Sequence, residues 1–263
     1  MTAHTIVAHD DWITARQELL AKEKEFTRVR DELSRQRRQL PWERVEKPYL
    51  FDTPGGKATL AELFSGKSQL IVYHFMFAPE WEEGCPSCSY VADHFDGSAV
   101  HLAQRDVTLL AVSRAPLGRI EAFKKRLGWR FNWVSSFGSD FNRDFHVSFT
   151  KSELANGAVY YNYNMQAFPA EEGPGVSVFF KEPATGEIYH TYSTYGRGLD
   201  ILIGAYNFLD LVPKGRDEDA LAFTMAWVRY HDRYVDNELV DLKRTYEPPK
   251  VTADTCCAGE EQS

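Results

Sequence analysis

The sequence contains no long apolar run and no segment resembling a secretory signal. No apolar stretch approaches the roughly 20 residues that cross a bilayer. Residues 1–11 include two histidines but no basic segment followed by an apolar one. We therefore expect a soluble, cytoplasmic protein that does not insert into membranes.

Positive charge is also scarce. The chain has 30 Lys and Arg against 38 Asp and Glu, which gives a formal net charge of -8. Such a chain repels the phosphates of nucleic acids and anionic lipids. We expect it to act on a protein or a small molecule and to bind neither nucleic acid nor a membrane surface.

Cysteine is rare, with four among 263 residues, so a disulfide scaffold is excluded. The apolar fraction of 43% is enough to bury a full core. Cys256 and Cys257 are adjacent in a polar tail, whereas Cys85 and Cys88 form a C-x-x-C pair. In a reducing compartment such a pair indicates catalysis or metal binding.

Three parts can be distinguished along the chain: an N-terminal helical arm (1–41), a central domain (42–213), and a C-terminal extension with a flexible tail (214–263). Apolar residues of the arm recur three or four apart as far as Pro41, which predicts an amphipathic helix. Its outer face is either solvated or bound to a partner helix. Together with the aromatic segment around Trp227, the arm suggests a homodimer interface.

The central part alternates apolar runs with helical patterns. We predict strands at 49–52, 69–77, 107–112, 131–136, 176–180 and 187–192, and helices at 86–95, 117–127 and 199–211, with an insertion at 160–175. A strand–helix–strand order implies parallel strands and right-handed crossovers. The fold class is therefore α/β, with a central mixed sheet flanked by helices.

The pair Cys85 and Cys88 lies where the strand at 69–77 leads into a helix, and Pro86 suits the first turn of that helix. A helix N-terminus stabilises a thiolate at Cys85, while Cys88 lies one turn inside and is shielded. This arrangement predicts a disulfide oxidoreductase in which Cys85 is the nucleophile and Cys88 the resolving thiol. We expect no bound cofactor.

Two acidic neighbours oppose ionisation of this thiol. If Glu82 and Glu83 face the sulfur, they raise the pKa of Cys85 and favour a reducing site. Trp81 is expected either beside the sulfur as a docking surface or packed beneath the loop.

Polar residues end the next strand at the same edge of the predicted sheet, because ligands gather beyond the carboxyl ends of parallel strands. Ser113 and Arg114 occupy that position. Arg114 is expected to stabilise a thiolate, to bind an acidic group, or to be an ordinary surface arginine.

Three segments carry a more specific signal: residues 75–88, with F-M-F-A-P-E-W-E-E-G-C-P-S-C, residues 112–116 and residues 133–142. They resemble a bacterial thioredoxin-like family catalogued as domain of unknown function 899. The resemblance implies a thioredoxin-like fold, with an N-terminal helical arm and a C-terminal extension, and names no substrate. Thioredoxins carry a cis-proline just before the hairpin, facing the cysteines. Pro174 lies near that position, but Gly175 intervenes before the strand, so Pro174 either takes that role or is an ordinary loop proline.

A peroxiredoxin-like thiol peroxidase is the first alternative, since the sheet order also resembles that superfamily. Peroxiredoxins carry a Pro-x-x-x-Thr-x-x-Cys loop. Here Pro79 is one position too close to Cys85, and Glu82 or Glu83 stands where the threonine is expected. Peroxide activation is disfavoured.

A metal-binding or metal-delivery protein is the second alternative. Zinc normally takes four ligands, and no second spaced pair is present. His94, on the helix, is the nearest candidate for a Cys-Cys-His site with Cys85 and Cys88, and His74 in the preceding strand is another candidate ligand. For both histidines an ordinary structural role is the simpler expectation. The tail thiols Cys256 and Cys257 are candidates for an electron relay or a soft-metal ligand pair.

Overall fold

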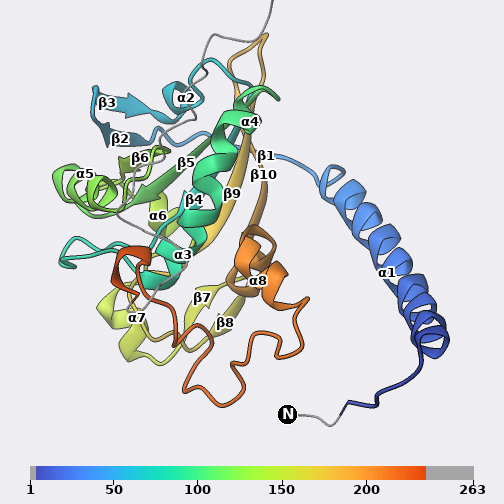
Figure 1. Cartoon of the computed structure of the whole chain (residues 1–263). Helices are drawn as coiled ribbons and strands as arrows, with labels where there is room; N and C mark the ends of the chain where they lie inside the picture. Colours follow the sequence, from blue (N-terminus) through green and yellow to red (C-terminus); the bar gives the residue numbers. More distant parts are fainter. Residues whose placement is uncertain (1–3, 235–263) are drawn as a thin grey trace, which may run out of the picture.

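The structure, a computed structural model, describes residues 4–234 and contains a mixed sheet in the order β1-β10-β9-β4-β5-β6-β2-β3 (Figure 1). Its strands are β1 (Glu43–Arg44), β2 (Leu50–Thr53), β3 (Gly56–Thr59), β4 (Gln69–His74), β5 (Val107–Ser113), β6 (Asn132–Ser135), β9 (Gly175–Lys181) and β10 (Ile188–Tyr195). A separate antiparallel pair joins β7 (Val159–Tyr161) to β8 (Asn164–Gln166).

Helices flank this sheet. The α-helices are α1 (His9–Arg37), α2 (Leu60–Leu63), α3 (Pro86–Phe95), α4 (Ala99–Ala103), α5 (Leu117–Arg126), α6 (Phe141–Asp144), α7 (Lys151–Ala155) and α8 (Gly204–Leu209). The 3-10 helices are η1 (Asp96–Ser98), η2 (Gly196–Leu202) and η3 (His231–Arg233).

The core of the sheet has the predicted thioredoxin-like topology. Strands β4, β5 and β6 are parallel and are joined through α3 and α5, while β9 pairs antiparallel with β4 and forms a hairpin with β10. The order β10-β9-β4-β5 follows from these pairings. The α/β class, the central mixed sheet and the N-terminal helix are confirmed.

Strand β4 is buried on both faces, as its continuous apolar sequence predicts. Leu70 and Val72 face the cluster under α2 and α6, whereas Tyr73 contributes to the cluster under α3 and α5. The strand ends at His74, three residues earlier than expected, although Phe75 and Phe77 still bond to the backbone at the end of β5 and just beyond it.

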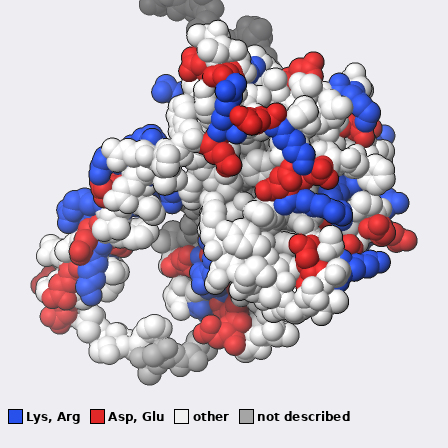
Figure 2. All heavy atoms as spheres, turned by 180° about the vertical axis from the view of Figure 1, so that it is seen from behind, with Lys and Arg blue, Asp and Glu red and all other residues white. Residues whose placement is uncertain are grey.

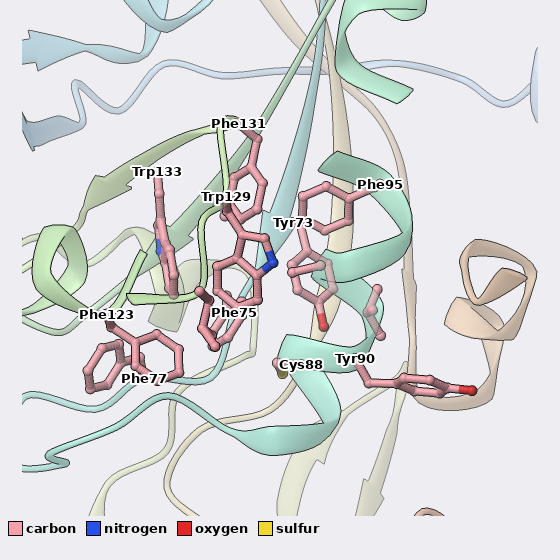
Figure 3. Close-up of a cluster of buried hydrophobic side chains, with 14 of the residues drawn as sticks. Tyr73, Phe75, Phe77, Cys88, Tyr90, Phe95, Phe123, Trp129, Phe131 and Trp133 are labelled. Atoms are coloured by element: carbon pink, nitrogen blue, oxygen red, sulfur yellow. The ribbon is translucent and has the colours of Figure 1, made fainter. Parts of the chain in front are cut away.

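The cluster under α3 and α5 is dominated by aromatic rings. Phe75 lies 4.4 Å from Trp133 and 6.0 Å from Trp129 between ring centroids, and Figure 3 shows these rings filling the space beside Cys88. Rings at such spacings add attraction beyond their burial. The aromatic packing therefore fixes α3, and with it the cysteine pair, against the sheet.

Two segments differ from the sequence prediction. The helix expected at 199–211 is instead η2 followed by the short α8. Gly204 lies inside the expected helix, at the point where η2 ends and α8 begins, and glycine is a poor residue in a helix interior. The insertion at 160–175 contains the β7–β8 pair, which the sequence pattern did not indicate.

The two ends of the described chain behave differently. Helix α1 has no buried residue and lies apart from the body (Figure 1). Residues 214–234 instead return to the body, where Val228 and Tyr230 join the aromatic cluster. Within residues 4–234, every helix is too short or too polar to traverse a bilayer.

Candidate functional site

Cys85 is the N-cap residue of α3. Its own N–H donates to the Met76 carbonyl at 3.0 Å, which ties the cysteine to the end of the β4 segment. Pro86 follows in the first helical turn, and the Ser89 N–H closes that turn on the Cys85 carbonyl at 2.9 Å. The sequence prediction of a cysteine at a strand-to-helix junction matches this geometry.

The two thiols have opposite electrostatic environments. A hydrogen bond from the Cys88 thiol lowers the pKa of Cys85 to about 7, and the N–H groups of Cys88 and Ser87 add to this against the effect of burial. Burial raises the pKa of Cys88 well above its ordinary value. At neutral pH a substantial fraction of Cys85 is therefore thiolate, while Cys88 stays protonated.

Cys88 has polar groups close to its sulfur in an otherwise apolar setting. The Met76 N–H lies 3.5 Å from Cys88 Sγ. The Tyr73 hydroxyl is buried, has no oxygen or nitrogen partner in the described part of the chain, and points toward Cys88 (Figure 3). Burial raises the pKa of Tyr73 well above its ordinary value, so this hydroxyl remains a donor beside the sulfur.

Both sulfur-bearing residues line one cavity of about 230 Å³. Its other lining residues come from five separate segments of the chain and are Tyr73, Met76, Ser87, Val91, Pro174, Gly196, Arg197, Leu199, Asp200, Ile203, Thr224 and Met225. Most of these side chains are apolar. The cysteine pair thus faces a small, mostly apolar pocket that is partly open to solvent.

Pro174, a candidate site residue from the sequence, lines this cavity but is not a cis-proline. The peptide bonds of residues 4–234 are all trans, so the cis-proline alternative is wrong and the loop-proline alternative remains. Tyr161 holds the segment, because its hydroxyl donates to the Pro174 carbonyl at 2.7 Å and accepts from the Gly196 N–H at 3.0 Å.

The acidic neighbours do not raise the pKa of Cys85. Glu83 forms ion pairs with Arg126 and Arg233. Burial acts to raise the pKa of Glu83, but the hydrogen bonds from these two arginines outweigh it and lower the pKa. Glu82 is exposed. The expected upward shift at Cys85 is therefore wrong, because the carboxylate charge of Glu83 is compensated by two guanidinium groups.

The two residues that follow β5 are engaged elsewhere. The Ser113 hydroxyl donates to the Phe75 carbonyl at 2.7 Å and accepts from Trp133 at 3.0 Å. Arg114 donates to Glu172 at 2.6 Å, and Glu172 is almost fully buried. Neither Ser113 nor Arg114 lines the cavity. Of the alternatives for Arg114, binding to an acidic group fits this geometry, and the group is Glu172 of the same chain.

Trp81 lies outside the cavity, half-buried against the aromatic cluster. Its carbonyl and that of Pro79 both accept from Arg119 at 2.6 Å. The packing alternative for Trp81 fits this position better than the docking one. Pro86 is exposed in the first turn of α3.

The histidines are not arranged as metal ligands. His94 uses both ring nitrogens, toward the Tyr90 carbonyl at 2.6 Å and the Ala205 N–H at 2.9 Å. His74 bonds to Ser177 at 2.8 Å on the opposite face of β4. Among residues 4–234, no three His, Cys, Asp or Glu side chains are grouped to hold a metal ion. Cys256 and Cys257 lie outside the described residues.

Several cavity residues were missed by sequence reasoning. Tyr73 read as an ordinary core residue of a buried strand, and its position one residue before His74 gave no sign that its hydroxyl meets a cysteine. Arg197, Asp200 and Met225 reach the cavity only through tertiary packing. The one available signal was the strand period, which places Tyr73 on the face of β4 that α3 covers.

Comparison with known proteins gives a family and a set of distant folds. A match to the family described as "Bacterial protein of unknown function (DUF899)" covers residues 1–234. No curated protein matches the chain. Solved structures that resemble it include a cysteine-to-serine mutant of PrxQ from Xylella fastidiosa, with 14% identity, a TM-score of 0.41, and coverage of 64% of this chain and 94% of that one.

Two further structures are similarly distant. Peroxidoxin BcpB of Mycobacterium tuberculosis has 12% identity and a TM-score of 0.41, and the match covers 63% of this chain and 94% of that one. A cysteine-to-serine mutant of peroxiredoxin Q from Xanthomonas campestris has 15% identity and a TM-score of 0.39, with coverages of 64% and 98%. The extent of the family match, over residues 1–234, shows that the chain belongs to the bacterial family of unknown function DUF899.

Proposed function

We propose that this protein is a dithiol–disulfide oxidoreductase whose working thiols are Cys85 and Cys88. The observation that carries the proposal is the contrast in their positions: Cys85 is the half-buried N-cap residue of α3, Cys88 is buried one turn inside, and both line one cavity. The lowered pKa of Cys85 and the raised pKa of Cys88 agree with this contrast. Thiol–disulfide exchange requires this pairing of an ionised attacking thiol with a protected second thiol.

The reaction balances as two exchanges. The Cys85 thiolate attacks one sulfur of a disulfide R–S–S–R′, forms a Cys85–S–S–R bond and releases R′S⁻, which takes a proton from water. Cys88 then loses its proton, attacks the Cys85 sulfur and expels RS⁻. Two electrons pass from the protein dithiol to the substrate, and an external dithiol reductant restores Cys85 and Cys88.

The geometry also assists the second exchange. Cys88 must become an anion in a buried setting, which is costly unless hydrogen-bond donors meet the charge. The Met76 N–H and the Tyr73 hydroxyl lie beside its sulfur. We assign Tyr73 a positioning role, in which its hydroxyl stabilises the thiolate that forms when Cys88 loses its proton.

The test is a redox titration of the Cys256→Ser/Cys257→Ser protein, which removes the tail thiols. The protein is equilibrated in dithiothreitol buffers and the oxidised fraction is quantified by thiol labelling and mass spectrometry. We expect a reversible two-electron transition that Cys85→Ser and Cys88→Ser both abolish. Absence of any Cys85–Cys88 disulfide contradicts the proposal, as does stoichiometric metal in the protein as isolated.

A peroxide assay separates this proposal from the peroxidase alternative. Arg114 binds Glu172 and Arg126 binds Glu83, while Arg197, which lines the cavity, pairs with Asp200. None of these three arginines is hydrogen-bonded to Cys85. We expect slow oxidation of Cys85 by hydrogen peroxide, close to the rate of a free thiol with the same pKa. A rate several orders of magnitude faster identifies a peroxidase instead.

A further inference from the structure

The cavity at Cys85 is partly walled by the C-terminal segment, and we infer that its substrates are small, uncharged disulfides and not the disulfides of folded proteins. This inference rests on the proposed function and adds a substrate class to it. The volume of the cavity, about 230 Å³, is below the roughly 300–1,000 Å³ of sites that bind drug-sized ligands.

The wall is anchored at several points. The Tyr230 hydroxyl donates to the Gly84 carbonyl at 2.6 Å, next to the reactive cysteine. Glu218 Oε1 accepts from the Tyr206 hydroxyl at 2.8 Å, the Trp227 ring N–H at 2.6 Å and the Met225 N–H at 3.1 Å. The Tyr230 bond is buried and the three bonds to Glu218 are part-buried, and each costs free energy to break. The segment that carries Met225 into the cavity is therefore held in place, and a bulky substrate must displace it.

The lining disfavours charged ligands. Arg197 and Asp200 are the charged residues that line the cavity, and they pair with each other at 3.1 Å. Asp200 also pairs with Arg216 at 2.8 Å. The Arg197 side chain is 84% exposed, so its charge is screened by water. A substrate carboxylate that moves into the apolar part of the cavity leaves that water, and burial of an unpaired charge is costly. Met76 and Met225 supply polarisable sulfur suited to contact with a disulfide.

The test compares three oxidants with the unmodified protein under pseudo-first-order conditions. They are bis(2-hydroxyethyl) disulfide, its similarly sized dicarboxylate counterpart dithiodiacetate, and insulin. Each rate of Cys85 oxidation is divided by the rate of the same oxidant with free dithiothreitol. We expect the neutral disulfide to exceed both others by at least about tenfold, because only it avoids burying a charge or displacing the wall.

A matched pair of variants tests the wall itself. Glu218→Ala removes the shared acceptor, and Glu218→Gln keeps an oxygen at that place. We expect Glu218→Ala to raise the normalised insulin rate by about tenfold with little change for the neutral disulfide, and Glu218→Gln to resemble the wild type. Equal normalised rates for insulin and the neutral disulfide in the wild type overturn the substrate class. A failure to form any Cys85–Cys88 disulfide overturns the proposed function itself.

A separate observation concerns α1, which carries a large apolar residue at every seventh position. These side chains are about half exposed: Trp12 (53%), Leu19 (51%), Phe26 (66%) and Leu33 (46%). A seven-residue apolar period forms the seam of a coiled coil. Ala15 and Val29 occupy companion seam positions, while Lys22 and Gln36 take the other two.

The charges beside this seam match a second copy of the same helix in parallel. Figure 2 shows both signs of charge along the arm. In a parallel pair Glu25 faces Arg30 of the second copy and Glu32 faces Arg37, with Glu18 against Glu23 as the one unfavourable contact. An antiparallel pair instead sets Glu18, Glu25 and Glu32 against one another. We propose that α1 forms a parallel two-stranded coiled coil between two copies of this chain.

Sedimentation equilibrium over a range of protein concentrations tests the dimer. Leu19→Glu changes the seam and Gln17→Glu makes a related change on the outer face. We expect a wild-type dimer that Leu19→Glu dissociates and Gln17→Glu leaves intact. Glu25→Arg should weaken the dimer and Glu25→Arg/Arg30→Glu should restore it. A wild-type monomer, or a dimer insensitive to Leu19→Glu, overturns the proposal, and failure of the double exchange to rescue overturns the parallel orientation.

Discussion

The hydroxyl of Tyr230 donates a 2.6 Å hydrogen bond to the carbonyl of Gly84, although the two residues are 146 positions apart in the chain. The bond joins the C-terminal segment to the residue that precedes the reactive thiol. Gly84 is itself closely packed, since a Cβ there would lie 2.6 Å from the Phe75 ring. The loop that delivers Cys85 is therefore held from both sides.

Loss of this bond should be measurable as loss of stability. Tyr230→Phe keeps the ring in its cluster but leaves a buried carbonyl without its partner, which costs about 1–3 kcal/mol. We expect a corresponding fall in the free energy of unfolding in urea. Tyr160→Phe is the matched control, because Tyr160 is 41% exposed, and it should change stability by less than about 0.5 kcal/mol.

Alkylation of Cys85 should follow a titration centred near pH 7, because only the thiolate reacts and its pKa is lowered to about 7. Below that pH the rate should fall about tenfold per unit. Cys88→Ala removes the strongest hydrogen bond to the thiolate, so the midpoint should move upward. The rate of alkylation by iodoacetamide is measured between pH 5 and 9 in the Cys256→Ser/Cys257→Ser protein, with and without Cys88→Ala. A midpoint that does not move in the Cys88→Ala variant contradicts this account.

Tyr73→Phe should slow the resolving exchange more than the first attack. The variant deletes the hydroxyl that points toward Cys88, and a hydrogen bond to a charged group contributes about 1.5–3 kcal/mol. We expect the intramolecular step to slow by about tenfold or more, with the attack by Cys85 little changed. Rapid-quench labelling separates the two steps. Tyr90→Phe is the control, since its hydroxyl is likewise buried and unpartnered within residues 4–234 but points away from Cys88.

Arg114→Ala should destabilise the protein in a pH-dependent way. Burial raises the pKa of Glu172 to about 7 even though Arg114 acts to lower it, so removing Arg114 raises this pKa further. When the pKa of a carboxyl group is higher in the folded protein than in the unfolded chain, the folded protein loses stability as pH rises. The loss takes place between the unfolded pKa, 4.5 for Glu172, and the folded pKa. We expect a loss of about 3–5 kcal/mol at pH 8 that shrinks markedly at pH 5.

Urea unfolding at both pH values checks that prediction. Arg130→Ala serves as control, because Arg130 is 76% exposed in its pair with Asp96 and such surface pairs contribute about 1 kcal/mol or less. A loss of stability in Arg114→Ala that is equal at pH 5 and pH 8 contradicts the role assigned to Glu172.

The sequence was informative where structure is local. The apolar run at β4 and the proline after Cys85 each specify their own conformation, the first through burial and the second through its restricted φ. The sheet topology then follows from the order of strands and helices. These features suffice to place Cys85 and Cys88 at the start of α3.

The surroundings of the sulfur could not be predicted in the same way. Arg114 was placed correctly at the end of β5, but its partner Glu172 lies in an insertion without periodic pattern. Glu83 neighbours Cys85 in sequence, yet its charge is compensated by Arg126 and Arg233 from distant segments. Side-chain pairing across the fold decided these electrostatics, and a single sequence does not encode it in a readable pattern.

The cavity that encloses Cys85 draws its walls from residues as far apart as Tyr73 and Met225. During synthesis, Cys85 leaves the ribosome long before Met225 has been added to the chain. The reactive sulfur of the nascent protein is then open to any oxidant or electrophile in its surroundings. The proposed selectivity is thus acquired only after Met225 has been added, and a chain interrupted before Met225 would carry a C-P-S-C pair without that part of the cavity wall.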